Sequence, residues 1–195
     1  MKVKICGITS AEDAFMCEEL GADALGFVHV SGRARSLQPG EIRDICGSLG
    51  PMVTTVLVCA PPDTGSALEL IDRSRARVVQ LYTLEGKSLD AIRATGVRVI
   101  RAVRPDPEEA DVFADHADAL LFESGKPGTG TGFDYSSVPV SRCRRAIIAG
   151  GLTVGNLEEA KRMNPYALDV SSGVESTPGS KDRALVSEFI RRCRS

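Results

Sequence analysis

The sequence has no tryptophan and few aromatic residues, which make up 5% of its 195 residues. It contains no apolar run close to the roughly 18–20 residues that a membrane-spanning helix needs, and no apolar leader follows its first residues. It also lacks a basic block and an acidic tail, and its formal net charge is −2. We therefore expect neither a membrane nor a nucleic acid to be a partner. An anionic small molecule would have to be recognised by the local chemistry of a site.

Disulfide and zinc motifs are missing as well. The six cysteines are scattered along the chain, and no two of them form a Cys-x-x-Cys pair. A chain of this length can bury a full core without disulfide bridges, so the spacing favours neither a bridged framework nor a metal site. We expect reduced thiols, no metal and a cytoplasmic location.

What the sequence does have is a regular alternation of strand-like and helix-like segments. Short β-rich apolar runs are followed by amphipathic stretches that begin at helix-capping residues. The predicted strands are 3–6, 23–30, 53–58, 77–81, 97–103, 117–122, 146–149 and 167–170. The predicted helices are 10–20, 39–48, 64–74, 86–94, one that begins at 105–107, 154–163 and 181–193.

This alternation predicts a parallel sheet, because each helix carries the chain back to start the next strand. Eight units favour a single-domain (β/α)₈ barrel over residues 1–195, and an open doubly wound sheet is the alternative if one strand assignment is wrong. The segment 124–141 breaks the rhythm. It is rich in glycine, serine, proline and threonine, and we expect a long loop with room for one short helix.

In a (β/α)₈ barrel the active site lies at the C-terminal ends of the strands, so the residues at or just after each predicted strand are the candidates. They are Cys6, Arg35, Gln80, Arg104, Glu123, Gly150, Gly151, Asp169 and 171–173.

Two consecutive glycine-containing loops, 149–153 and 169–175, follow the last two predicted strands. Glycines allow backbone N–H groups to approach an anion, and barrels often bind phosphate with these two loops. We therefore expect Gly150, Gly151, Ser172 and Gly173 to bind a phosphate. Tight turns without a ligand are the alternative for either loop taken alone.

Cys6 ends the first predicted strand. It is either an inert buried side chain or a thiolate that acts as a base or nucleophile. Lys4 faces the same side of the strand, and its charge is expected to lower the pKa of the thiol. Glu123 ends the sixth strand and is either a general acid with a raised pKa or a surface carboxylate. The loop 124–133 is either a substrate-covering lid or a simple connector.

These features together resemble phosphoribosylanthranilate isomerase of tryptophan biosynthesis, and the resemblance runs along the whole chain. It is strongest in the opening Val-Lys-Ile-Cys-Gly-Ile-Thr and in the closing Asp-Val-Ser-Ser-Gly-Val-Glu. The segments that carry it are 3–9, 21–28, 35–39, 79–81, 128–135, 149–152, 169–175 and 178–182.

The resemblance implies an aldose–ketose isomerase, formally an intramolecular oxidoreductase, that uses no cofactor or metal. The reaction would be an Amadori rearrangement of N-(5′-phosphoribosyl)anthranilate, a small phosphosugar, in a monomer or homodimer. The implied roles are Cys6 as general base, Glu123 as general acid, Arg35 beside the anthranilate carboxylate, Asp169 with Lys4 and Gln80 around the aminosugar, and Gly150, Gly151, Ser172 and Gly173 around the phosphate.

The sequence departs from the family pattern in three places. Glu123 stands where the family usually has Asp, Tyr82 where it usually has His, and 33–34 is Arg-Ala where it usually has Ser-Pro. The longer acid puts the carboxyl one methylene further out, and a displacement of about 1 Å can cost on the order of 10²-fold in rate.

Other functions fit less well. Indole-glycerol-phosphate synthase chemistry needs a catalytic lysine and an extra N-terminal helix, whereas this chain begins at its first strand. A histidine-pathway sugar isomerase would have Asp at the position of Cys6. A non-catalytic phosphosugar-binding barrel would keep the glycine loops and lose the acid or the base, and only the change at Glu123 favours it.

Overall fold

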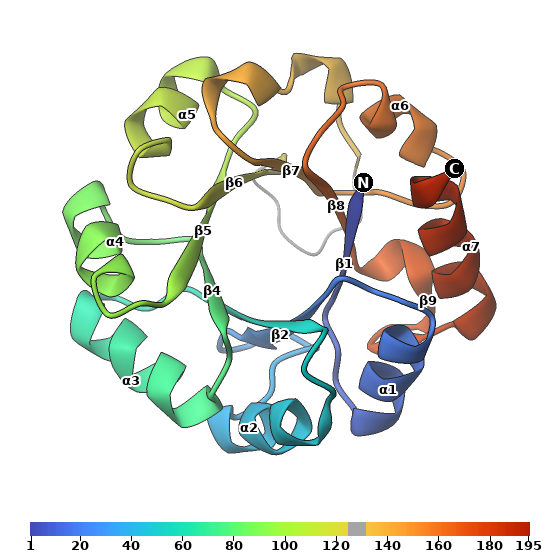
Figure 1. The fold of residues 1–195 in the computed structure, drawn as a ribbon, viewed down its shortest axis with the longest axis horizontal. Helices are drawn as coiled ribbons and strands as arrows, with labels where there is room; N and C mark the ends of the chain where they lie inside the picture. The colour runs from blue at the N-terminus through green and yellow to red at the C-terminus, as the bar shows by residue number, and fades with distance from the viewer. Residues whose placement is uncertain (125–131) are drawn as a thin grey trace.

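Eight parallel strands close into a barrel, and the helices form a ring around it (Figure 1). The computed structural model describes residues 1–124 and 132–195. Each strand pairs with the next along the chain, and β1 pairs with β8, so the barrel closes on itself. The predicted closed barrel is confirmed, and the open doubly wound sheet is excluded. The barrel strands are β1 (Lys2–Cys6), β2 (Ala24–His29), β3 (Thr54–Cys59), β4 (Val78–Leu81), β5 (Arg98–Val103), β6 (Ala119–Phe122), β7 (Ala146–Ile148) and β8 (Ala167–Val170).

The helices begin where the sequence supplies a cap. Ser10, Asp63, Asp106 and Asp182 each accept a backbone N–H from the first turn that follows, which satisfies a donor that the helix itself leaves unpaired. The helices are α1 (Ala11–Glu19), α2 (Pro39–Ser48), α3 (Thr64–Ser74), α4 (Gly86–Arg93), α5 (Pro107–Phe113), α6 (Leu157–Lys161) and α7 (Arg183–Arg194).

Two predicted helices differ from the observed ones by more than one residue at an end. The helix expected over 154–163 is shortened to α6, because Asn156 accepts a hydrogen bond from the Thr153 backbone N–H at 2.8 Å and closes a turn there. The last helix begins after Asp182, two residues later than predicted, because Lys181 belongs to a short strand.

That strand is part of a two-stranded hairpin that the sequence did not predict. β9 (Glu175–Thr177) and β10 (Ser180–Lys181) pair antiparallel between β8 and α7, next to the 3₁₀ turn η3 (Ser172–Val174). The segment predicted as a long loop contains two 3₁₀ turns, η1 (Tyr135–Ser137) and η2 (Val140–Arg142). Most of the proposed lid 124–133 lies outside the described residues.

Side chains of the barrel strands alternate between two cores. One set, including Leu25, Phe27 and Phe122, packs outward against the helices. The other set, including Val58 and Leu121, fills the inside of the barrel. Cys6 belongs to this inner set, so β1 directs its thiol to the barrel axis and Lys4, two residues earlier, to the same side.

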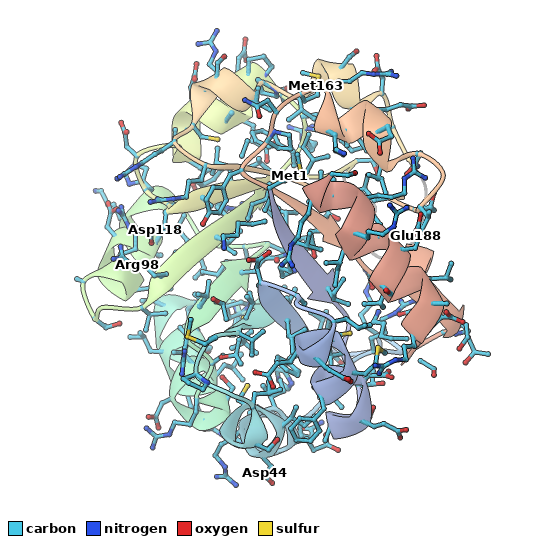
Figure 2. The ribbon with its side chains drawn as sticks, turned by 45° about the vertical axis from the view of Figure 1, so that its right-hand side comes forward. Met1, Asp44, Arg98, Asp118, Met163 and Glu188 are labelled. Atoms are coloured by element: carbon cyan, nitrogen blue, oxygen red, sulfur yellow. The ribbon has the colours of Figure 1, made fainter. Side chains whose placement is uncertain are left out.

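The segment Ala-Asp-Ala-Leu occurs twice and opens both β2 and β6. Its aspartates, Asp23 and Asp118, each accept a backbone N–H of the preceding barrel strand at 2.9 Å. Each also pairs with a cation of that strand, Lys2 at 2.7 Å and Arg98 at 2.9 Å. Figure 2 labels Arg98 and Asp118, which lie close together on the flank of the molecule. Burial raises the pKa of both carboxyls, but the hydrogen bonds and cations outweigh it and hold each pKa below its ordinary value.

In the described part of the chain, no helix has both the length and the apolar character needed to cross a bilayer.

Candidate active site

A cavity of about 470 Å³ opens at the C-terminal ends of the barrel strands. The sequence predicted a site at this end of the barrel. Residues from β1, from the loop after β2, and from the ends of β6, β7 and β8 line it together. Of the predicted site residues, the lining includes Cys6, Arg35, Glu123, Gly150, Gly151, Asp169 and Ser172.

Three predicted site residues do not line the cavity. Lys4 and Gln80 lie inside the barrel, and both are almost fully buried. Gly173 packs against the neighbouring loop, where an added Cβ would overlap the carbonyl oxygen of Leu152. These residues therefore support the cavity wall from behind.

Lys4 and Asp169 form a buried ion pair beneath Cys6. The Lys4 ammonium nitrogen is 3.0 Å from each carboxylate oxygen of Asp169. Burial lowers the pKa of Lys4, but the charges of Asp169 and Cys6 outweigh it and raise the pKa, so Lys4 stays cationic. Gly26 leaves the room for this arrangement, since an added Cβ would lie 2.7 Å from the Cys6 sulfur.

The pKa of Cys6 is raised. Burial of the thiol is the largest cause, and the attraction of Lys4 only partly offsets it. The expected effect of Lys4 is thus present, but the net direction is opposite to the one expected from Lys4 alone. Cys59 also ends a strand, and burial without a nearby cation raises its pKa to about 12. Cys6 differs from it by facing the cavity beside a cation that can stabilise a thiolate.

Glu123 is 8% exposed, and burial raises the pKa of its carboxyl. A hydrogen bond from Tyr82 acts in the opposite direction and is too weak to reverse the shift. Burial likewise raises the pKa of Tyr82, which keeps it a neutral donor. Its hydroxyl accepts a hydrogen bond from Gln80 Nε2 at 3.2 Å. Gln80 therefore contacts the site through Tyr82, the residue that stands where the family usually has His.

Arg35 is anchored by two residues that the sequence analysis did not single out. Its guanidinium donates two hydrogen bonds to the carboxylate of Glu175. Lys181, whose side chain is fully buried, donates to the same carboxylate at 2.7 Å. Both anchors fall in segments that carry the family resemblance, 169–175 and 178–182, which is the signal that could have identified them.

The loop after β7 has the conformation expected of an anion-binding turn. Gly150 and Gly151 have φ values of +85° and +66°, which other residues rarely adopt. Tyr135 donates to the Gly150 carbonyl at 2.8 Å, and Asn156 donates to the Gly151 carbonyl at 2.9 Å. Fixing both carbonyls leaves the backbone N–H groups of this loop, together with Ser172 from the next loop, available for a phosphate.

Arg104, a further candidate at a strand end, and the two histidines of the chain also lie away from the cavity lining. Arg104 pairs with Glu109 on the surface. His29 contacts the Leu37 carbonyl at 2.8 Å, and His116 pairs with an aspartate of α4. Among residues 1–124 and 132–195, no group of three or more metal-ligating side chains is arranged to hold an ion.

Comparison with known proteins gives a consistent result. A sequence profile described as N-(5'phosphoribosyl)anthranilate (PRA) isomerase matches residues 3–192. The N-(5'-phosphoribosyl)anthranilate isomerase of Geobacter metallireducens is 40% identical over 203 residues, which cover 100% of both chains.

Solved structures agree with the sequence comparison. Phosphoribosyl anthranilate isomerase from Thermus thermophilus is 38% identical with a TM-score of 0.91, over 100% of this chain and 98% of that one. A phosphoribosyl anthranilate isomerase in complex with reduced 1-(o-carboxyphenylamino)-1-deoxyribulose 5-phosphate is 33% identical with a TM-score of 0.88, at the same coverage of 100% and 98%.

Proposed function

The chain belongs to the N-(5′-phosphoribosyl)anthranilate isomerase family, and we propose that Cys6 and Glu123 are the base and the acid of its reaction. It is an isomerase that converts N-(5′-phosphoribosyl)anthranilate to 1-(2-carboxyphenylamino)-1-deoxyribulose 5-phosphate in tryptophan biosynthesis. The observation that carries the residue assignment is the cavity itself. It brings a thiol, a carboxyl and two glycine loops from four strand ends to one space of about 470 Å³.

The acid step comes first. Glu123 donates its proton to the furanose ring oxygen, the bond from that oxygen to C1′ breaks, and the nitrogen lone pair forms a protonated Schiff base. A carboxyl suits this role when its pKa is raised so that it can hold a proton. The burial of Glu123 has that effect.

The base step follows. The Cys6 thiolate removes the C2′ proton, and the electrons of the C–H bond move toward the iminium nitrogen to give an enolamine. This intermediate tautomerises to the ketone, so the substrate neither gains nor loses atoms overall. Lys4 stabilises the thiolate by its charge, since it lies beside Cys6 inside the barrel.

The substrate would be held at both ends. Arg35 would bind the anthranilate carboxylate, because a guanidinium matches a carboxylate in shape and charge. Gly150, Gly151 and Ser172 would bind the phosphate through their backbone and hydroxyl groups, with Gly173 packed behind Ser172 in the same loop. Asp169 would orient the aminosugar between them, with Lys4 and Gln80 fixing the geometry from behind. None of these steps uses a cofactor.

Substrate turnover tests the assignment. Loss of the fluorescence of the anthranilate adduct is measured for the wild type, Cys6→Ser and Glu123→Gln. Each variant is expected to lose at least about 10²-fold in kcat, the usual contribution of a positioned acid or base. Cys46→Ser, at a half-buried thiol on α2 away from the cavity, is the matched control and should keep full activity.

The outcomes separate the proposals. If Glu123→Gln has the kcat of the wild type, another residue is the acid. A wild type that binds phosphate ligands without turnover would instead favour a non-catalytic phosphosugar-binding barrel.

We also propose a single folding domain that works in the cytoplasm as a monomer or homodimer. All six cysteines are free, which suits a reducing compartment. Sedimentation analysis of the purified protein would decide its assembly state.

A further inference from the structure

We propose that Glu175 is a positioning residue that aims the guanidinium of Arg35 at the substrate carboxylate and so sets the preference for a carboxylated arylamine. The inference rests on the proposed role of Arg35 and extends it to a residue that does not line the cavity.

The contact between the two side chains uses one defined edge of the guanidinium. Arg35 Nε donates to Glu175 Oε1 at 2.8 Å, and Arg35 Nη2 donates to Glu175 Oε2 at 2.6 Å. A guanidinium has five N–H donors in a planar fork, so this side-on pair leaves the edge formed by Nη1 and the second hydrogen of Nη2. That edge can take a second carboxylate in the same plane.

Glu175 is itself held rigidly. The hairpin sets Lys181 opposite Glu175 in the register of β9 and β10. Lys181 donates to Glu175 Oε1 at 2.7 Å and to the Ser171 carbonyl at 3.3 Å. Although burial raises the pKa of Glu175, the bonds from Arg35 and Lys181 outweigh it and lower the pKa to about 2, so the carboxyl is ionised at neutral pH.

Arg35 is confined from the other side by the loop after β1. Gly7 has a φ of +74°, and a Cβ at this position would lie 2.6 Å from the Arg35 Cδ. The arginine stem thus passes over a glycine directly after the strand that carries Cys6. Because both ends of the side chain are fixed, the guanidinium loses little further freedom when a ligand binds.

The charges of this cluster also point to an anionic ligand. Two cations, Arg35 and Lys181, share the one carboxylate of Glu175, so Glu175 does not fully neutralise Arg35. Lys181 is buried and does not line the cavity, whereas Arg35 does. The uncompensated charge is therefore presented to the cavity through Arg35.

Two substrates that differ only in the carboxylate test this proposal. The N-(5-phosphoribosyl) adducts of anthranilate and of aniline are prepared from the amine and ribose 5-phosphate. For each enzyme, the selectivity is kcat/KM for the anthranilate adduct divided by kcat/KM for the aniline adduct. Arg35→Met gives the reference value, that is, the selectivity expected when the anthranilate carboxylate has no arginine to bind it.

Glu175→Gln keeps the size of the side chain but can accept only one of the two guanidinium bonds. We expect the selectivity to fall by about tenfold or more, mainly through a higher KM for the anthranilate adduct. The loss of one hydrogen bond between charged groups weakens binding by about this factor. In the Arg35→Met background, Glu175→Gln should lower the selectivity no further. Glu188→Gln is the matched control, since Glu188 forms the same bidentate pair with Arg191 on the outer face of α7 (Figure 2).

Folding is followed by urea denaturation. If Glu175→Gln alone does not fold, Glu175→Gln/Lys181→Met removes the unpaired ammonium and carries the same selectivity test. Equal losses on both substrates, with unchanged selectivity, would overturn the positioning role. If Arg35→Met also keeps the selectivity of the wild type, the proposed carboxylate site fails, and with it this inference. A wild type inactive on both adducts would be a failure of the proposed function itself.

Discussion

The ammonium nitrogen of Lys4 lies 3.0 Å from both carboxylate oxygens of Asp169, although 165 positions separate the two residues in the sequence. The pair exists because β1 and β8, the first and last barrel strands, close the barrel with Lys4 opposite Asp169. Both side chains are buried, so the charge of each one depends on the other. The thiol of Cys6 sits beside this pair and is affected by both charges.

Lys4→Met should therefore damage both stability and activity. The free energy of unfolding is expected to fall by about 3–5 kcal/mol, because an uncompensated carboxylate remains buried. The pKa of Cys6 should rise further without its cation, so kcat/KM falls as well. Urea denaturation and steady-state kinetics measure the two effects. Lys2→Met is the control on the same strand, and loss of its exposed pair should cost no more than about 1 kcal/mol. Equal stability of the two variants would contradict this account.

The pH profile of kcat/KM should have two widely separated limbs. The active form has a proton on Glu123 and none on Cys6, and the other singly protonated form has the reverse arrangement. Both forms hold one proton, so the active fraction is constant between the two pKa values. We expect the acid limb above 4.5, the ordinary pKa of a glutamate, and the alkaline limb above 9.0, that of a cysteine, because burial raises both. An alkaline limb near neutral pH would show that the thiol is activated in the free enzyme.

Gly173→Ala should push the two proposed phosphate loops apart. The added Cβ would overlap the carbonyl oxygen of Leu152, and a backbone atom cannot move aside without moving its loop. A shift of about 1 Å in the site is expected to lower kcat/KM by roughly 10²-fold and to weaken inhibition by inorganic phosphate. Gly47→Ala is the control, since this α2 glycine has open space around its Cβ position and alanine should add about 0.5–1 kcal/mol of stability. Full activity of Gly173→Ala would mean that the two loops can move independently.

The repeated aspartates predict a loss of stability in acid. Asp118→Asn should lower the free energy of unfolding by about 1–3 kcal/mol at pH 7, since a charged acceptor of two hydrogen bonds is lost. The pKa of Asp118 in the folded protein is below its ordinary value of 3.8. Its contribution is therefore complete above that value and disappears as pH falls through the folded pKa. Denaturation at a series of pH values should show the wild type and the variant converging in acid. Asp115→Asn, at an exposed aspartate close by, should have no such effect.

Much of this protein is determined by the sequence alone. The alternation of apolar runs and capped amphipathic segments predicted a parallel sheet, because each helix must return the chain before the next strand begins, and the eight units favoured a barrel over an open sheet. Cys6 and Glu123 could be proposed as site residues because parallel strands all end at the same rim, so polar residues at strand ends converge there. The resemblance then indicated the family and its isomerase reaction, and the comparisons confirm both.

Other properties were decided only by the tertiary structure. The sequence suggested that Lys4 would lower the pKa of Cys6, but burial, which depends on the whole barrel, has the larger effect. Gln80 and Lys4 are buried and do not line the cavity, because side chains fill the inside of the barrel below the strand ends. Glu175 reaches Arg35 across 140 positions of sequence through a hairpin that no local pattern indicated. Local periodicity fixes which face of an element is buried, whereas the depth of burial and the partner of a charge depend on distant segments brought together by the closed barrel.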